Sequence, residues 1–333
     1  MADTPWSTCG PWRFLIAPGW DRPGFPEVLA QLSFLLEKQS APLAIPGRNR
    51  VDRLALPWGD DSLDAVVKTY GLQSAGRDRL AARSGSKAWR AFQTASLLRA
   101  AGVGTPTPVA VVERWEGTRL RASRLVTTYV PDLGNLRDEL DRMYAQSPYC
   151  APLMTLLQCT ATAVRAMHDA GILHRDLGNQ NIGLRRNPDN ADSPWEVLFL
   201  DLNRAHVMPD PPLEERGADL ARLDLPSDFL RVFHAMYFHG HPPPAAFQTA
   251  EHKARRAFAI HTALRPVRHP LREARLRHTL RANPPPLRGR EIWIWDDRSA
   301  QAIPAYTPRD RRKLLPAANV SASLHGLARK GLA

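Results

Sequence analysis

The chain has 333 residues, of which 44% are hydrophobic and 23% are charged. This composition excludes an intrinsically disordered or fibrous protein, and the length is enough for one large domain or two smaller ones with a buried core. The formal net charge of +12 favours anionic partners such as nucleic acid, anionic lipid or a phosphorylated substrate. An arginine-rich amino-acid usage would explain part of the same charge.

Membrane and targeting signals are not found in the sequence. No apolar run reaches the length needed to cross a bilayer. The N-terminus lacks the basic region and apolar core that are typical of a signal peptide. The cysteines, Cys9, Cys150 and Cys159, are odd in number and do not have the spacing of metal ligands. A reducing, cytoplasmic location is therefore expected.

The first part of the chain, residues 1–130, contains mostly predicted strands. Alternating apolar residues and turn residues indicate two hairpins, with Lys68 near the end of the first one. One helix lies between the hairpins and ends at Gly102. The predicted elements are a strand at 12–17, a helix at 26–38, strands at 50–56 and 63–70, a helix at 86–101, and strands at 107–114 and 120–130.

The second part, residues 131–333, is mostly helical. This order of elements predicts an α+β fold with a small β-rich N-terminal lobe, which includes an N-terminal extension, and a larger, mostly helical C-terminal lobe with a basic C-terminal region. A late strand-like segment either packs on the helices or pairs with residues 300–306. The predicted elements are helices at 136–144 and 151–170, strands at 182–184 and 197–200, further helices and loops after 204, and the strand-like segment at 291–295.

The strongest chemical signal lies in residues 174–181, which read His-Arg-Asp-Leu-Gly-Asn-Gln-Asn. This loop follows a predicted helix and precedes a predicted strand. A carboxylate at Asp176 can accept the proton of a hydroxyl group or orient that hydroxyl. The amide oxygen of Asn181 can complete a magnesium shell. A polar surface loop would match His-x-Asp by chance, but the Leu and the Asn at fixed offsets favour a functional loop.

Two further residues complete the chemistry of phosphoryl transfer. Asp201 ends an apolar strand, where its carboxylate suits a hard cation that bridges phosphates. Lys68 also ends an apolar strand, where its ammonium can hold phosphates as a point charge. Taken alone, an Asp at a strand end is usually a turn residue and a strand Lys is usually a solvated edge residue. Their positions before and after the 174–181 loop favour binding roles.

This set of motifs resembles the protein-kinase signature set. More narrowly, residues 45–225 resemble the lipopolysaccharide-core kinases, which include Kdo kinases and core heptose kinases. Three features carry the narrower resemblance: the lack of a Gly-x-Gly-x-x-Gly loop before Lys68, the passage Leu97–Pro108 that runs through Ala-Gly to Thr-Pro-Thr-Pro, and the sequence Asp-Leu-Asn-Arg-Ala at 201–205.

The resemblance implies a bilobal protein-kinase-like fold and an ATP-dependent kinase that uses Mg²⁺. It implies that Lys68 and Asp201 with Mg²⁺ hold ATP, that Asn181 supports the metal, and that Asp176 acts on the acceptor hydroxyl. The main chain of Thr128, Tyr129 and Val130 would bind the adenine edge as a hinge. The implied acceptor is a sugar or glycolipid, a Kdo or heptose of the lipopolysaccharide inner core, at the cytoplasmic face of the inner membrane.

Two departures from the kinase pattern keep other functions open. The predicted helix at 86–101 has no acidic residue to pair with Lys68. Leu202-Asn203 follows Asp201 in place of Phe-Gly, which argues against the activation-loop switching of regulated protein kinases. The alternatives are a kinase of another small-molecule or protein hydroxyl and a pseudokinase that binds a partner.

The segment 250–281 is basic and carries interleaved apolar residues. It could lie against an anionic membrane surface, or it could be a solvated face of the helical lobe. Nucleic acid is an unlikely partner because no known binding motif occurs. The histidines in and before this segment have irregular spacing and are predicted to lie at the surface; they are His234, His239, His241, His261 and His269.

Overall fold

The computed structural model describes residues 5–43, 49–71, 85–146, 151–187, 193–225, 227–268, 270, 292–296 and 301–305. The chain divides into two compact units. Unit 1 comprises Met1–Asp132 and Leu198–Met208, and unit 2 comprises Leu133–Val197 and Pro209–Ala333. The strands concentrate in unit 1 and the helices in unit 2, so the predicted α+β class is confirmed.

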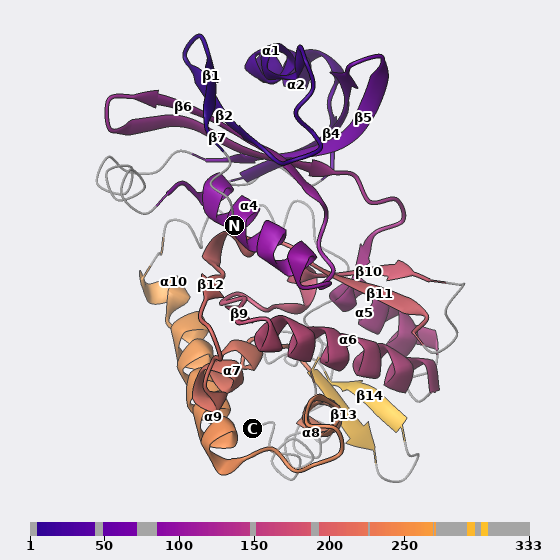
Figure 1. The fold of residues 1–333 in the computed structure, drawn as a ribbon. Coiled ribbons are helices and arrows are strands. Elements are labelled where there is room, and N and C mark those ends of the chain that lie inside the picture. The colour runs from indigo at the N-terminus through magenta and orange to yellow at the C-terminus, as the bar shows by residue number, and fades with distance from the viewer. Residues whose placement is uncertain are drawn as a thin grey trace. The chain divides into compact units, whose positions relative to one another are not determined.

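Unit 1 is built on a seven-stranded antiparallel sheet (Figure 1). Its order is β1-β2-β6-β7-β5-β4-β3, which places β5 between β4 and β7. Every strand predicted in this part of the chain is present, and the short β1 and β3 at the edges are additional. The strands are β1 (Ser7–Cys9), β2 (Trp12–Ile16), β3 (Ala41–Pro42), β4 (Asn49–Trp58), β5 (Asp61–Tyr70), β6 (Pro108–Glu116) and β7 (Arg119–Thr128).

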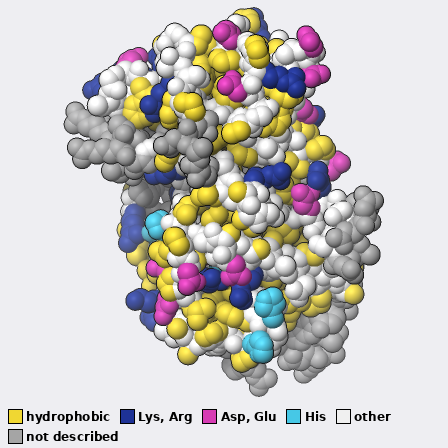
Figure 2. All heavy atoms as spheres, viewed as in Figure 1, with side chains coloured by type: hydrophobic (Ala, Val, Ile, Leu, Met, Phe, Trp, Pro, Cys, Tyr) yellow, Lys and Arg dark blue, Asp and Glu magenta, His cyan; other side chains and the backbone are white. Residues whose placement is uncertain are grey.

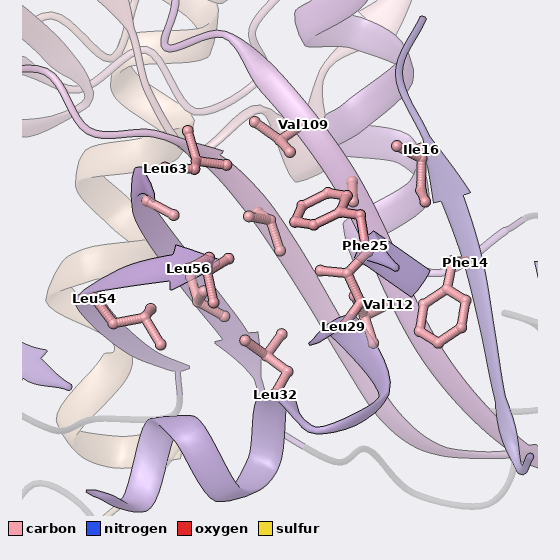
Figure 3. Packing of buried hydrophobic residues seen from close by; sticks show 14 of the residues in the cluster. Phe14, Ile16, Phe25, Leu29, Leu32, Leu54, Leu56, Leu63, Val109 and Val112 are labelled. Carbon is pink, nitrogen blue, oxygen red and sulfur yellow. The ribbon is translucent and has the colours of Figure 1, made fainter. Parts of the chain in front are cut away.

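Helices α1 (Phe25–Ala30) and α2 (Leu32–Gln39) cover one face of this sheet. The predicted single helix at 26–38 is wrong, because the helix breaks at Gln31, where φ is −87° and ψ is 3°. The break lets two short helices, instead of one straight one, bury their apolar faces against the twisted sheet. Figure 3 shows the resulting core, in which the labelled side chains are Phe14, Ile16, Phe25, Leu29, Leu32, Leu54, Leu56, Leu63, Val109 and Val112.

Helix α4 (Lys87–Ala100) packs on β6 and β7 from the opposite face. Its first turn is capped by Ser86, whose hydroxyl accepts the main-chain N–H of Trp89. The helix ends before Gly102, which has φ of +73° and so adopts the left-handed conformation that commonly terminates helices. The predicted end at Gly102 is confirmed, and of the two serines that the sequence offers as caps, Ser84 and Ser86, the cap is Ser86.

Unit 2 contains most of the helices. A small sheet with the order β11-β10-β8 lies beside them, and the chain leaves this unit through β11. The elements are β8 (Gly134–Asn135), α5 (Leu136–Gln146), α6 (Ala151–Asp169), β9 (Ile172–Leu173), η1 (Asn179–Asn181), β10 (Ile182–Arg186), β11 (Trp195–Phe199), α7 (Leu213–Leu220), α8 (Ser227–Tyr237), α9 (Ala245–Ala263), α10 (Arg265–Arg268), β13 (Ile292–Asp296) and β14 (Gln301–Ala305).

The last part of the chain decides how the late strand packs and corrects the predicted position of one histidine. β13 pairs antiparallel with β14, so the late strand forms a hairpin. His234 is buried on α8, in contrast to the predicted surface position, because its ring packs edge-on against Phe247 of α9 at 5.2 Å. His239, His241 and His261 are exposed, and His269 lies outside the described residues. None of the helices in the described part of the chain has the length and apolarity to cross a membrane.

The core of unit 1 gives a direct stability test. Phe14 has 0% exposure, so Phe14→Ala removes a buried ring and leaves a cavity. We expect the free energy of unfolding to fall by about 3–5 kcal/mol. Phe34→Ala on α2 is the matched control, because Phe34 is 57% exposed and should change stability by less than about 0.5 kcal/mol. Urea denaturation measures both variants, and equal effects would contradict the packing described.

Candidate active site

Lys68 lies near the end of β5, a central strand of the unit 1 sheet. Successive side chains of a strand point to opposite faces. Val67 is part of the core beneath α1 and α2, so Lys68 points to the face on which α4 packs. Its Nζ atom lies 2.5 Å from Oδ1 of Asp201. The Lys68 side chain is 18% exposed and that of Asp201 is 31% exposed, so the ion pair is partly shielded but reachable from solvent.

Asp201 is brought to Lys68 by the return of Leu198–Met208 into unit 1. Two hydrogen bonds fix this return: the Phe199 N–H donates to the carbonyl of Gly104 at 2.8 Å, and the buried Thr105 hydroxyl donates to the carbonyl of Phe199 at 2.8 Å. Asp201 itself has φ of +57° and ψ of +47°, a left-handed conformation that Asp tolerates better than most residues. The strand end therefore aims a carboxylate at a fixed place.

Helix α4 carries no acidic residue that could pair with Lys68. Asp201 supplies the carboxylate that Lys68 requires, and the amide of Asn203 donates a second hydrogen bond to the same oxygen of Asp201. Tyr70 lies two positions after Lys68 on the same face of β5, with its ring 5.4 Å from the Lys68 ammonium. Burial, and then the charge of Asp201, raises the pKa of Tyr70, so this hydroxyl stays protonated at neutral pH.

The predicted hinge follows β7 in unit 1. The main-chain N–H of Thr128 donates to Thr107 at 2.9 Å, and that of Tyr129 donates to Asp64 at 2.9 Å. Both groups are therefore committed to the fold and not to a ligand. The main-chain N–H of Val130 has no hydrogen-bond acceptor among the residues that the structure describes. If adenine binds this segment, the main-chain N–H donor is therefore that of Val130.

The catalytic-loop candidate, residues 174–181, lies in unit 2. The amide of Asn181 donates to the main-chain carbonyl of Asp176 at 2.7 Å, which brings the two predicted residues together. The Nδ2 atom makes this bond, so Oδ1 is the atom of the Asn181 amide that can act as an acceptor. The loop closes further because Gly178 N–H donates to the same Asp176 carbonyl at 2.7 Å. The carboxylate of Asp176 lies 2.9 Å from the guanidinium of Arg222.

Asp219 on α7 anchors this loop and was not predicted. Its carboxylate is fully buried and accepts the main-chain N–H groups of His174 at 2.7 Å and Arg175 at 2.6 Å. His168 Nε2 lies 3.2 Å from the same carboxylate, and His168 Nδ1 lies 2.7 Å from the hydroxyl of Tyr237. A carboxylate only accepts, so His168 must donate through Nε2 and accept through Nδ1 when it is neutral.

The charge state of this buried network follows from its contacts. Burial alone would raise the pKa of Asp219, but the hydrogen bond and attraction of His168 and the N–H of His174 outweigh burial and hold the pKa below its ordinary value. Burial raises the pKa of Tyr237 to about 12, so its hydroxyl remains a donor. Arg175, immediately before Asp176, has φ of +62°, a strained conformation that the Asp219 bonds over-determine.

The predicted residues thus fall into two groups. Unit 1 holds Lys68, Asp201 and the 128–130 segment, whereas unit 2 holds Asp176 and Asn181. The residues that sequence reasoning missed all act on these groups: Thr105 and Asn203 in unit 1, and Asp219 and Arg222 in unit 2. Helix α7 is rich in charged residues, so the sequence does not set Asp219 apart from its neighbours Glu214, Glu215 and Arg216.

The donor atoms of both groups suit Mg²⁺. The Asp201 carboxylate and the Asn181 amide oxygen are hard oxygen donors, which Mg²⁺ prefers over nitrogen or sulfur. Within the described ranges, no three His, Cys, Asp or Glu residues gather into a metal-binding cluster. Mg²⁺ in kinases is commonly held by one or two carboxylates together with substrate phosphates, so this sparse donor set fits.

Comparison with known proteins bears on the family and the fold. Residues 73–230 match the lipopolysaccharide kinase (Kdo/WaaP) family. A solved structure described as "WaaP in complex with acyl carrier protein" is similar with a TM-score of 0.51 and 24% sequence identity, over 73% of this chain and 98% of that one. No curated protein gives a match. The resemblance to lipopolysaccharide-core kinases and the kinase-like fold are confirmed, and the chain is a kinase.

Proposed function

We propose that this kinase of the lipopolysaccharide kinase (Kdo/WaaP) family transfers the γ-phosphoryl group of ATP to a hydroxyl of a Kdo or heptose in the lipopolysaccharide inner core. The observation that carries the proposal is the ion pair of Lys68 and Asp201 at 2.5 Å, reached by residues 133 positions apart. A partly exposed cation and carboxylate held together in this way are the groups that a nucleotide–Mg²⁺ complex needs.

In this proposal the residues of unit 1 bind the nucleotide. Lys68 would hold the phosphate oxygens of ATP, and Asp201 would hold the metal ion through its carboxylate. Asn203 and the Phe199 contacts keep Asp201 oriented. Val130 receives the adenine edge. The bound Mg²⁺ would neutralise the charge that develops on the transferred group and the leaving phosphates.

The residues of unit 2 act on the acceptor. Asp176 accepts the hydrogen bond of the sugar hydroxyl and takes its proton as the transfer proceeds. A bond forms between the sugar oxygen and the γ-phosphorus while the bond from that phosphorus to the β–γ bridging oxygen breaks, and ADP departs with the bonding electron pair. Asn181 would support the metal ion through Oδ1, because its Nδ2 donates to the Asp176 carbonyl.

The acceptor can be identified by direct competition. We expect labelled phosphate from ATP to enter purified core glycolipid that ends in Kdo or carries heptose, and not a generic protein substrate. Acceptors that contain Kdo alone and Kdo with heptose separate the two sugars. Phosphorylation of the protein substrate without labelling of either glycolipid would contradict the proposal and favour the protein-kinase alternative.

We further propose that the chain meets its lipid-linked substrate at the cytoplasmic face of the inner membrane through one face of α9 and α10. This α9 face comprises exposed residues at helical spacing, namely Lys253, Arg256, Ile260, Leu264, Val267 and Arg268. Ile260, Leu264 and Val267 are 50%, 40% and 77% exposed. In Figure 2, basic, acidic and apolar side chains lie side by side on the visible surface of the molecule.

Charge supports a membrane as the occupant of the α9 face. Glu251 is the sole acidic residue between 245 and 268, and it is buried and paired with Arg255 at 2.6 Å. The outer surface of both helices is therefore cationic around an apolar strip. Such a helix lies in the interface of an anionic bilayer, with its apolar side chains among the acyl chains and its basic ones among the head groups.

The membrane contact is testable with vesicles. The double change Lys253→Glu and Arg256→Glu should weaken binding to phosphatidylcholine–phosphatidylglycerol vesicles by at least about 10-fold, since each basic residue contributes about 1 kcal/mol. The control is Arg119→Glu in unit 1, which should bind normally. Co-sedimentation measures both variants. Unchanged binding of the double variant to the vesicles would overturn the membrane assignment.

A further inference from the structure

We infer that Arg222 is a positioning residue for phosphoryl transfer, because it fixes the carboxylate that receives the acceptor hydroxyl. The inference rests on the proposed function and adds to it a residue outside the kinase signature motifs. Arg222 Nη1 donates to Asp176 Oδ1 at 2.9 Å. The two residues are 46 positions apart, and both lie in unit 2.

The ion pair of Arg222 and Asp176 is held by a further contact of the arginine with an aromatic ring. The guanidinium of Arg222 lies 4.8 Å from the centre of the Phe258 ring on α9, a distance at which a cation is attracted to an aromatic face. The side chain of Arg222 is 35% exposed and that of Asp176 is 25% exposed. Surface ion pairs with free side chains contribute little, whereas a pair held in one geometry can orient a reacting group.

The main chain around Arg222 is held from two sides. Arg255 of α9 donates to the carbonyl of Leu223 at 2.9 Å. The next residue, Asp224, exchanges two hydrogen bonds with Asn179 of the catalytic loop, at 2.8 and 3.0 Å. The segment that carries Arg222 is therefore fastened both to α9 and to the loop that carries Asp176.

This arrangement has a chemical consequence for the transfer step. A carboxylate has about four lone-pair sites, so Asp176 can accept from Arg222 and from a hydroxyl at the same time. The planar guanidinium restricts rotation of the carboxylate and so sets the direction in which the hydroxyl is held. Arg222 acts through Asp176 and does not bind the nucleotide in this account.

Arg222→Ala should lower kcat by about 10²-fold, the cost of a misplaced reacting group, with the KM for ATP unchanged. Arg222→Lys should have a kcat between those of Arg222→Ala and the wild type, because Lys keeps the positive charge but lacks the planar guanidinium. Added guanidinium should restore part of the Arg222→Ala activity, and urea, which has a similar shape but no charge, should not. Arg231→Ala, an exposed arginine on α8, is the control and should keep the wild-type kcat.

A second arm separates a positioning role from a structural one. In an Asp176→Asn background, Arg222→Ala should cause no further loss, because the arginine acts through the aspartate. Each variant is assayed both with core glycolipid and for ATP hydrolysis by water. If the wild-type protein hydrolyses ATP but does not phosphorylate the glycolipid, the proposed acceptor is wrong. The rates of ATP hydrolysis by the variants then still test the role of Arg222. Unchanged kcat in Arg222→Ala, lack of guanidinium rescue, or additive losses with Asp176→Asn would overturn the inference.

Discussion

Replacing Asp201 with Asn is expected to lower kcat/KM for ATP by about 10³-fold or more, because a bound metal ion supplies several kcal/mol of charge stabilisation and each 1.4 kcal/mol is a factor of about 10. The substitution keeps the size of the side chain. Asn also tolerates the left-handed conformation at φ +57°. The loss is therefore one of charge and metal affinity and not of local backbone structure.

The magnesium dependence should report the same loss. Wild type should saturate with Mg²⁺, whereas Asp201→Asn should require far more Mg²⁺ or should not saturate. Asp210→Asn is the matched control, because Asp210 also has positive φ, at +48°, and its side chain is fully exposed. Wild-type turnover and an unchanged Mg²⁺ requirement in Asp201→Asn would contradict the assignment of Asp201 to the metal.

Replacing Asp219 with Asn is expected to lower the free energy of unfolding at neutral pH by about 3–5 kcal/mol, the usual result of breaking a buried charged pair. Asn offers one acceptor oxygen, yet three donors converge on the Asp219 carboxylate: His168 and the main-chain N–H groups of His174 and Arg175. The amide hydrogens of Asn would face at least one of these donors. kcat should also fall, because the loop that carries Asp176 loses its anchor.

The effect of Asp219 should depend on pH in one direction. Its pKa is below the ordinary value in the folded protein, so its contribution to stability is complete above the unfolded pKa of about 3.9. That contribution is lost as the pH falls through the lower, folded pKa. The difference in stability between wild type and Asp219→Asn should therefore be largest at neutral pH and should shrink below about pH 4.

Urea denaturation of both proteins between neutral pH and the acid limit measures this difference. Asp224→Asn is the control, since Asp224 lies in the same unit with an exposed side chain and contacts the loop through its main chain. It should change stability by less than about 0.5 kcal/mol. A stability difference for Asp219→Asn that stays constant with pH would contradict the ionised, hydrogen-bonded state.

Local patterns were sufficient to predict most elements of the fold. Period-two alternation located β4, β5, β6 and β7, and Ser86 with Gly102 located both ends of α4. The same patterns could not show the break at Gln31, because the apolar spacing of 26–38 suits one helix, and only the sheet beneath it requires two. They also could not show that His234 is buried, because its cover comes from Phe247 on another helix.

The partner of Lys68 could not be predicted for a related reason. The sequence identified Lys68 and Asp201 separately, but it gave no information on the hydrogen bonds from Gly104 and Thr105 that return the chain to β5. The acid-free helix therefore seemed to leave Lys68 without a carboxylate, which favoured a pseudokinase. The ion pair with Asp201 removes that argument.

Asp219 and Arg222 could not be predicted because each contacts the 174–181 loop from more than 40 positions away. In the sequence they are an Asp in the last turn of a charged helix and an Arg just past the end of that helix. Neither pattern distinguishes a buried anchor from a surface residue. The contacts that assign them depend on how α7 and α9 pack around the loop.

The most direct measurement of the central claim is single-turnover phosphoryl transfer from ATP to core glycolipid by Asp176→Asn and wild type, both saturated with ATP and Mg²⁺. Asp176→Asn should bind ATP with the wild-type affinity and transfer phosphate about 10²–10⁴-fold more slowly, the contribution of a positioned general base. Transfer to the sugar at the wild-type rate by Asp176→Asn would contradict the account.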